Sequence, residues 1–420
     1  TPQSIIKING GCRRTGSRFL TYRKRNDMNN NEFKKGIAVG VAVTLVVTGT
    51  GFAGYQKIMF PKGSALSDTK TVQKLNYLES LINEEYLEEK EEDSLREGLY
   101  AGLMSGLNDP YSTYYTAEQY KELNTSNEGS YVGIGAVLQK DKDGGAKIVQ
   151  LYEGGSGEQA GLKKGDVLKA IDGEDVTEKE TSDIASMIRE SDKDSVTLTI
   201  QRDEETKEIK VEIRDVEIQT VSHEMLDDET GYIRISEFSE VTSNQYKKAF
   251  EDLQDKGMKK LVVDLRDNPG GLLTAVCDVL RQILPEGLIV YTEDKNGKKE
   301  EEKCDGKSEL AMPLAVLVNG GSASASEIFA GAVKDYGIGT IVGTTTYGKG
   351  VVQTIQPLSD GSAVKITIAK YFTPKGNDIN KKGIAPDVEA ELSEDSTDWT
   401  ELTYEEDTQL QAALKEIRQN

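Results

Sequence analysis

Three apolar stretches in the second half of the chain share one pattern, in which the sequence of a buried strand ends in a Gly-rich turn. They cover residues 261–271, 314–326 and 339–350. The first two run directly into apolar helical sequence, at 272–284 and 327–334. Strands that alternate with helices fold into a sheet covered by helices, and active sites of such folds lie at the carboxyl ends of the strands. The pattern therefore predicts an α/β core over residues 216–392, with the three turns at one edge of its sheet.

The second of these turns holds a candidate nucleophile. It reads Ala-Ser-Ala-Ser-Glu-Ile over residues 323–328 and joins the strand to the helix. A serine at such a junction exposes its hydroxyl beside the free helix amides, which suits either a helix cap or a nucleophile. A cap is the commoner of the two roles. We take Ser324 as the candidate nucleophile, while Ser322 and Ser326 are rivals that the spacing does not exclude.

The third turn holds a candidate base, Lys349, 25 positions after that serine. A base must be neutral near pH 7, and a solvated lysine, with a pKa of about 10.4, is not. Burial lowers the pKa of a lysine by several units, and Gly348 and Gly350 let the backbone approach this one closely. Gln353 is spaced to orient its amine. His223 is the single histidine of the chain and the competing base, but its polar surroundings are typical of a surface.

The first turn could supply donors for an oxyanion. Its sequence, Asp-Asn-Pro-Gly-Gly at 267–271, suits an exposed backbone N–H at Gly271, with Ala325 completing the pair. The same sequence is also ordinary turn chemistry. Asp335, in the helix after Ser324, is a candidate supporting residue that anchors the site by a salt link, although a solvated helix residue fits as well.

Residues 130–215 form a separable unit of short strands, Gly-rich loops and one helix at 180–191. Their order, including QAGLKKGDVLKAIDG at 159–173, resembles a PDZ domain of the circularly permuted bacterial kind. In that fold a glycine loop presents amides to a terminal carboxylate, and the bound peptide adds a strand to the sheet edge. A β-module that only packs against its neighbours is the alternative. The resemblance implies peptide contacts from Tyr131, Val132, Gly133, Ile134, Gly135 and, as a polar sensor of the tail, Lys169.

Residues 36–55 carry no charge, and 20 residues at a rise of 1.5 Å span the roughly 30 Å hydrocarbon core of a membrane. Residues 1–35 hold nine Lys or Arg against two Asp or Glu, an excess that keeps an N-terminus in the cytoplasm. We expect a single-pass anchor in the cell membrane with an extracytoplasmic body. A buried core helix is disfavoured by the frequent Gly and Thr. A cleaved signal peptide is the other alternative, although the basic segment is long for one.

The remaining composition excludes some partners. The net charge of −21 argues against a nucleic-acid partner. Because no Cys/His cluster has metal-ligand spacing, we expect no metal, and no cofactor. Residues 56–129 have helical spacing that suits packing or dimerisation, and 393–420 end in a short amphipathic helix. Cys277 reads as a buried thiol, and nothing in the sequence supports a bridge from it to Cys304.

Several motifs in one order resemble the C-terminal processing peptidases, also called tail-specific proteases, over residues 66–392. The family uses a Ser-Lys dyad assisted by Gln, which the resemblance carries onto Ser324, Lys349 and Gln353. It also implies oxyanion donors at Gly271 and Ala325, support from Asp335, no cofactor, and substrates that are proteins or peptides with accessible C-terminal tails; a homodimer fits the family. The motifs are LNDPYSTYYTAEQY (107–120), RDNPGG (266–271), NGGSASASEIFAGA (319–332), YGKGVVQ (347–353) and YFTPKGNDINKKGIAPDVE (371–389).

The sequence thus predicts an α/β multidomain chain whose serine-peptidase core carries an inserted PDZ domain, and a membrane-anchored extracytoplasmic serine endopeptidase. Two rival functions remain. One is a non-catalytic PDZ scaffold at the cell envelope, and the other is a crotonase-like acyl-transfer enzyme, whose fold also pairs glycine amides as an oxyanion hole. The predicted divisions are a basic cytoplasmic segment (1–35), a transmembrane anchor (36–55), a helical N-terminal region (56–129), the PDZ domain (130–215), the peptidase core (216–392) and a helical tail (393–420).

Overall fold

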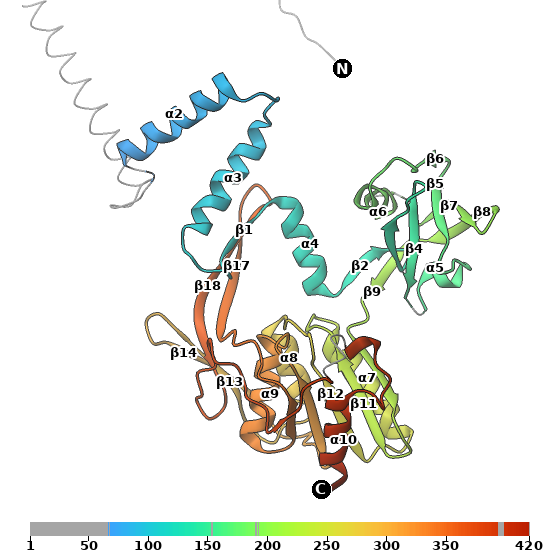
Figure 1. Cartoon of the computed structure of the whole chain (residues 1–420), viewed down its shortest axis with the longest axis vertical. Coiled ribbons are helices and arrows are strands. Elements are labelled where there is room, and N and C mark those ends of the chain that lie inside the picture. Colours follow the sequence, from blue (N-terminus) through green and yellow to red (C-terminus); the bar gives the residue numbers. More distant parts are fainter. Residues whose placement is uncertain are drawn as a thin grey trace, which may run out of the picture. The chain divides into compact units, whose positions relative to one another are not determined.

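A six-stranded sheet forms the centre of the α/β core in the computed structural model (Figure 1). Five of its strands, β11, β12, β15, β16 and β19, run parallel to one another, and β10 is antiparallel at the edge. The parallel arrangement agrees with the strand–helix alternation of the sequence. In spatial order the strands are β10 (Val221–Met225), β11 (Thr230–Ile235), β12 (Lys260–Asp264), β15 (Leu314–Val318), β16 (Thr340–Gly343) and β19 (Val388–Glu389).

Helices cover both faces of this sheet, which explains why its strands read as continuous apolar runs. One face packs on α7 (Thr242–Asp255), α8 (Leu273–Leu280) and α9 (Ala325–Tyr336) through a large buried cluster. On the other face, alternate residues such as Val262, Ala315 and Leu317 pack on Leu410 and Leu414 of α10 (Thr408–Gln419). The C-terminal helix is therefore part of the core.

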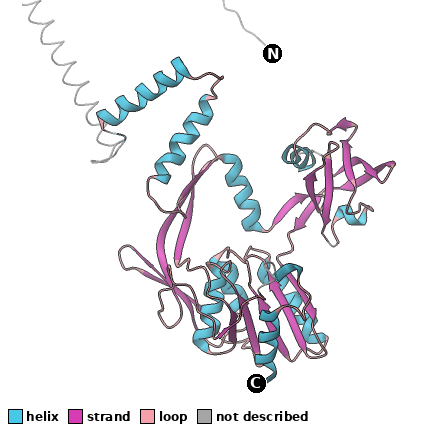
Figure 2. Cartoon of the chain, viewed as in Figure 1, coloured by secondary structure: helices cyan, strands magenta, loops and turns pink. Residues whose placement is uncertain are grey.

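A second, antiparallel sheet stands beside the core, and no motif of the sequence predicted it (Figure 2). Its strand β17 begins two residues after Lys349 and contains Gln353. The sheet therefore holds the segment that follows the candidate base. Its strands are β1 (Thr113–Tyr115), β13 (Gly287–Asp294), β14 (Lys299–Cys304), β17 (Val351–Pro357) and β18 (Ala363–Phe372).

The predicted β-module is a small sheet with its own apolar core, built around Ile148, Leu168 and Leu198. Helix α6 (Thr181–Arg189) packs against β2 and β3, and a short helix, α5 (Ser156–Gln159), precedes the Gly-rich loop. Strand β2 (Ser130–Gly133) pairs with β9 (Arg214–Glu217), where the chain enters and leaves the module. The other strands are β3 (Ala136–Lys140), β4 (Ala146–Leu151), β5 (Val167–Ile171), β6 (Glu174–Asp175), β7 (Ser195–Arg202) and β8 (Glu205–Glu212).

The structure describes residues 66, 68–152, 154–189, 191, 193–393 and 399–419. The predicted cytoplasmic segment and membrane anchor, at 1–35 and 36–55, lie outside these residues. Within the described ranges, no helix has the length and apolar character needed to cross a membrane. The chain divides into two compact units at residues 91 and 92.

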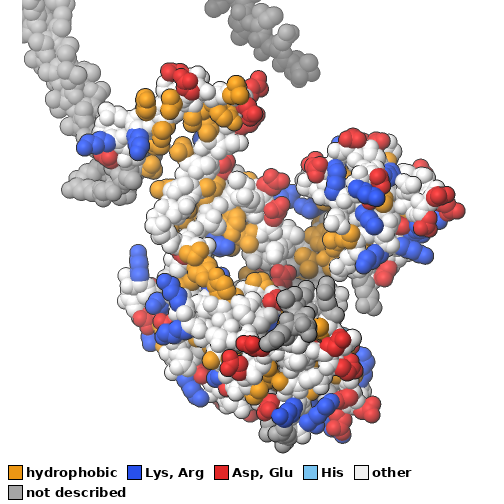
Figure 3. Space-filling view, viewed as in Figure 1, with side chains coloured by type: hydrophobic (Ala, Val, Ile, Leu, Met, Phe, Trp, Pro, Cys, Tyr) orange, Lys and Arg blue, Asp and Glu red, His pale blue; other side chains and the backbone are white. Residues whose placement is uncertain are grey.

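Two helices near the N-terminus bury no residue at all, α2 (Thr69–Glu85) in the first unit and α3 (Glu92–Ser105) in the second. Each exposes several large apolar side chains, which appear in orange in Figure 3. Helix α4 (Ala117–Glu128) follows in the region predicted to be helical, and it begins at a reciprocal capping box of Thr116 and Gln119. Cys277 and Cys304 are both buried and free, so no bridge joins them.

Candidate active site

Ser324 lies in a strained turn between β15 and α9. Its φ of 54° is uncommon for a residue with a side chain and costs about 1–3 kcal/mol. The backbone N–H of Glu327, the usual partner of a capping hydroxyl, donates to the Ser324 carbonyl at 2.9 Å. The backbone N–H of Ser324 donates to Glu327 Oε2 at 2.8 Å. Ser324 and Glu327 thus have the arrangement of a capping box, but the N–H of Glu327 is already bonded to a backbone carbonyl, so the Ser324 hydroxyl is not required as its acceptor.

The two rival serines have other partners. Ser322 is fully buried, and its hydroxyl donates to the carbonyl of Leu265 at 2.7 Å. Ser326 is also fully buried and donates to the carbonyl of Asn268 at 3.0 Å. Both bonds hold the second turn against the first. Ser324 is half-buried and lines a pocket of about 260 Å³, so it is the serine that a substrate can reach.

Lys349 lines the same pocket as Ser324. Its ammonium nitrogen lies 5.0 Å from the centre of the Tyr111 ring. Burial, and next the charge of Lys365, hold the pKa of Lys349 below its ordinary value, although the carboxylates of Glu327 and Asp109 act in the opposite direction. The direction of this shift is the one that a lysine base needs.

Glu327 connects the candidate nucleophile to the candidate base. It is fully buried, and the same oxygen that accepts the N–H of Ser324 accepts that of Lys349 at 2.9 Å. Its other oxygen accepts the hydroxyl of Thr346 and the N–H of Gly348, both at 2.7 Å. No pattern in the sequence predicted a role for Glu327. Its capping-box spacing from Ser324 was a signal for the local bond, but not for the distant partners.

Gly271 and Ala325, the two predicted oxyanion donors, come from different turns of the chain. The N–H of Gly270 donates to Asn268 Oδ1 at 2.8 Å, so that amide is occupied. The amides of Gly271 and Ala325 have no acceptor among the residues that the structure describes, and both residues line the pocket. Gly271 has a φ of 139°, and a Cβ there would lie 2.1 Å from the Phe238 carbonyl oxygen. Only glycine fits this position.

The predicted helper residues are divided between two places. Gln353 lines the pocket, and its side-chain amide donates to Thr367 Oγ1 at 3.2 Å and to the Val351 carbonyl at 3.3 Å. Asp335 is not among the pocket residues. It accepts the N–H of Lys375 at 2.8 Å and so holds the loop after β18. Its interactions are those of a residue that supports packing.

His223 also lies apart from this pocket. It is exposed on the edge strand β10, where its Nε2 is 2.8 Å from Asp252 Oδ2 of α7. Among the described residues, no group of three or more His, Cys, Asp or Glu side chains has the geometry of a metal site.

The predicted peptide-contact residues of the β-module share one segment, with the exception of Lys169. Tyr131, Val132 and Gly133 lie in β2, and Ile134 and Gly135 follow directly. Burial, and next the neighbouring Tyr152, raise the pKa of Tyr131 to about 12. The amine of Lys169 instead donates to the carbonyl of Gly144 at 2.7 Å, in a different loop.

Arg189 of α6, which no motif in the sequence indicated, lies near this segment. Its charge acts on the Tyr131 hydroxyl, and its Nε is buried with no hydrogen-bond partner among the described residues. It is therefore better placed than Lys169 to meet a carboxylate near β2. The only sign of Arg189 in the sequence was its place near the end of the helix predicted over 180–191.

Comparison with known families identifies three segments. A model of peptidase family S41 matches residues 229–390, and a PDZ domain model matches 147–202. A model described as the activating protease CtpB N-terminal domain matches 50–119.

Individual relatives match most of the chain. It is 36% identical to the carboxy-terminal processing protease CtpA of Bacillus subtilis (strain 168), over 87% of this chain and 77% of that protein. It is 34% identical to a probable CtpA-like serine protease of Staphylococcus aureus (strain COL), over 83% and 70% of the two chains. Among solved structures, the photosystem II D1 C-terminal processing protease is 30% identical over 78% of this chain and 89% of that chain, with a TM-score of 0.45.

Proposed function

The chain belongs to the C-terminal processing peptidases of family S41, which are serine peptidases, and we propose that it cleaves peptide bonds with a Ser324–Lys349 dyad. One observation carries the proposal. Both residues line one pocket, and their backbone amides meet on a single buried carboxylate oxygen. The lowered pKa of Lys349 supports its role as the base.

The proposed reaction has two halves. Lys349 Nζ accepts the proton of the Ser324 hydroxyl while Oγ attacks the carbonyl carbon of the peptide bond, and the N–H groups of Gly271 and Ala325 donate to the oxyanion that forms. The protonated lysine then gives its proton to the leaving amine, and an acyl ester remains on Ser324. In the second half the neutral amine takes a proton from water, the hydroxide attacks the ester, and the serine regains its proton. Gln353 orients the amine.

We further propose that the PDZ domain captures the C-terminal tail of a protein substrate. The segment from Tyr131 to Gly135 forms the proposed carboxylate loop, with Arg189 beside it. A peptide with a free, apolar C-terminus should be cleaved faster than the same peptide with an amidated end. Equal rates for the two peptides would contradict tail recognition.

Three variants test the dyad on such a peptide. Ser324→Ala and Lys349→Ala should abolish cleavage but retain peptide binding, whereas His223→Gln should cleave normally. A dead His223 variant together with an active Lys349 variant would overturn the assignment. Peptide binding without any turnover by the unmodified chain would instead favour the scaffold function, which no observation supports.

The membrane anchor at 36–55 and an extracytoplasmic body remain part of the proposal. They are supported by the uncharged span and the basic segment before it. The full chain should sediment with membranes after an alkaline wash and be released by detergent. Release by the wash alone would contradict an anchor.

A homodimer is also proposed, supported by the unburied apolar side chains of α2 and α3. Light scattering of the purified chain should give twice the monomer mass. Leu99→Glu on α3, where the side chain is 54% exposed, should lower that mass. A monomeric mass for the unmodified chain would exclude the dimer.

A further inference from the structure

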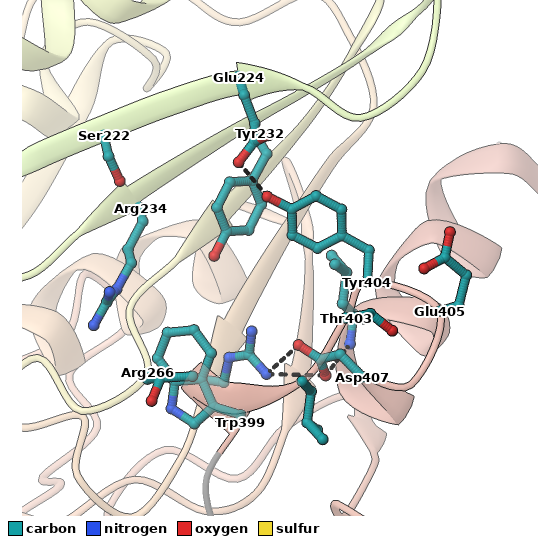
Figure 4. Close-up of a pocket in the computed structure, with 13 residues that line it drawn as sticks. Ser222, Glu224, Tyr232, Arg234, Arg266, Trp399, Thr403, Tyr404, Glu405 and Asp407 are labelled. Atoms are coloured by element: carbon teal, nitrogen blue, oxygen red, sulfur yellow. Dashed lines mark hydrogen bonds and ion pairs between the residues drawn. The ribbon is translucent and has the colours of Figure 1, made fainter.

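Trp399 joins the C-terminal segment of the chain to the turn that contains Gly271. Its indole N–H donates to Asp267 Oδ2 at 2.6 Å. Its ring stacks against two guanidinium groups, 4.0 Å from Arg266 and 4.7 Å from Arg234. Figure 4 shows Trp399 beside Arg266 in a pocket of about 510 Å³ on the face of β10 and β11. These contacts fix the ring of a residue that precedes α10.

The arginine under this ring is itself rigidly held. Arg266 is 1% exposed and forms ion pairs with Asp264 at 2.6 Å and with Asp407 at 2.8 Å. Asp407 also accepts the N–H of Leu410 in the first turn of α10. Because Asp264 and Asp407 pair with Arg266, the guanidinium on which Trp399 stacks is held in the buried core.

Asp267, the acceptor of the Trp399 N–H, is also bonded to the loop that leads to Ser324. It adopts a φ of 56°, and it exchanges two hydrogen bonds of 2.9 Å with the side chain of Asn319. Asn319 Oδ1 also accepts the N–H of Gly321. One carboxylate thus connects Trp399, the 266–271 turn and the loop that leads to Ser324.

We propose that Trp399 is a positioning residue for catalysis, which acts through Asp267 to fix the turn of Gly271 against the loop of Ser324. This inference rests on the proposed function, because the position of the turn matters to the reaction only if Gly271 donates to the oxyanion. An oxyanion donor acts only when it is preorganised at the right distance. The C-terminal segment therefore contributes to the rate of the chemical step.

Trp399→Phe tests this role, since it removes the N–H and keeps an aromatic ring, although a smaller one, to stack on the arginines. We expect kcat to fall about ten-fold, the loss of one charge-assisted hydrogen bond, with KM unchanged. Amide hydrogen exchange in the 266–272 peptide should become faster in the same variant. A role limited to overall stability would lower the melting temperature without this split between kcat and KM.

Tyr404→Phe is the matched control. Tyr404 lies in the same pocket and also donates to a carboxylate, that of Glu224, but it has no hydrogen bond to the turn. Its loss should leave both kcat and the exchange of the 266–272 peptide as in the unmodified chain. An equal effect of both variants would overturn the specific role of Trp399.

Asp267→Asn provides the second arm, because asparagine tolerates the positive φ while it removes the charge. If Trp399 acts through Asp267, the double variant should be as active as the less active of the two single variants. Effects that multiply, or unchanged exchange in Trp399→Phe, would overturn the inference. An unmodified chain that cleaves no tail-bearing peptide would instead overturn the proposed function, and exchange alone would then decide whether Trp399 holds the turn.

Discussion

Ser324 and Lys349 donate their backbone N–H groups to the same atom, Glu327 Oε2, at 2.8 and 2.9 Å. These two residues are 25 positions apart and lie in different loops, one directly before α9 and the other before β17. Their relative position is therefore fixed by one side chain that touches neither reacting atom in these bonds. The other oxygen of the carboxylate is equally occupied.

Glu327→Gln should reduce both activity and stability. A glutamine has one acceptor oxygen in place of two, so its amide group faces donors that it cannot satisfy. The cost of such unpaired buried groups is about 1–3 kcal/mol. We expect a lower midpoint in urea unfolding and at least a ten-fold loss of kcat, as the separation of the dyad changes. Glu251→Gln, on the exposed surface of α7, is the control and should change neither value.

The pH dependence of cleavage should report the ionisation of Lys349. The reaction needs its neutral form, so kcat/KM should rise with pH and level off above its lowered pKa. Lys365→Gln removes the second cause of the lowering, and the rising limb should move to higher pH. Lys370→Gln, on the same strand but paired with Asp378, should leave the limb in place. If the rising limb stays at the same pH in Lys365→Gln, Lys349 is not the titrating base.

Lys349→Met should stabilise the fold at neutral pH. Because the pKa of Lys349 is lower in the folded chain than in the unfolded chain, the unfolded chain binds more protons between the two values. The free energy of unfolding therefore rises with pH in that window, and below it the full cost of the partly buried charge is present. The advantage of methionine should shrink as pH approaches about 10.4. Urea unfolding at pH 7 and pH 10 measures this difference, with exposed Lys295→Met as the control.

Gly271→Ala should distort the turn that presents the oxyanion donor. Its φ of 139° is strained for alanine, and the new Cβ would collide with the carbonyl of Phe238. We expect a loss of stability of about 2 kcal/mol or more and a larger loss of kcat than of binding. Gly320→Ala has open space and no positive φ, so it should retain both. Full activity in the Gly271 variant would exclude its amide as a donor.

The parts of the molecule that the sequence predicted share a strong apolar pattern. The strands of the six-stranded sheet are buried on both faces, so 314–318 reads as a continuous apolar run. In the second sheet such a run is confined to residues 288–291 of β13. Strand β14 reads Lys-Glu-Glu-Glu-Lys-Cys. Most of its side chains are exposed, and backbone pairing with β13 makes it a strand.

The candidate site was predicted only in part, because some of its contacts join residues that are distant in sequence. Spacing and turn chemistry indicated Ser324, Lys349 and Gln353, and the structure brings these three to one pocket; their chemical roles stay predictions. The choice among neighbouring serines depended on the bonds of Ser322 and Ser326 to a turn more than 50 residues away. Glu327 and Trp399 were missed for the same reason, since their partners are distant in sequence.

Arg266 meets Asp407 only 141 positions later in the chain. Ser324 and Lys349 are therefore both synthesised before Asp407, the second ion-pair partner of Arg266. In a chain that ends before Asp407, Arg266 would keep its ion pair with Asp264 and lack the one with Asp407. The first turn therefore gains its full set of ion pairs only once the segment before α10 has folded onto the core.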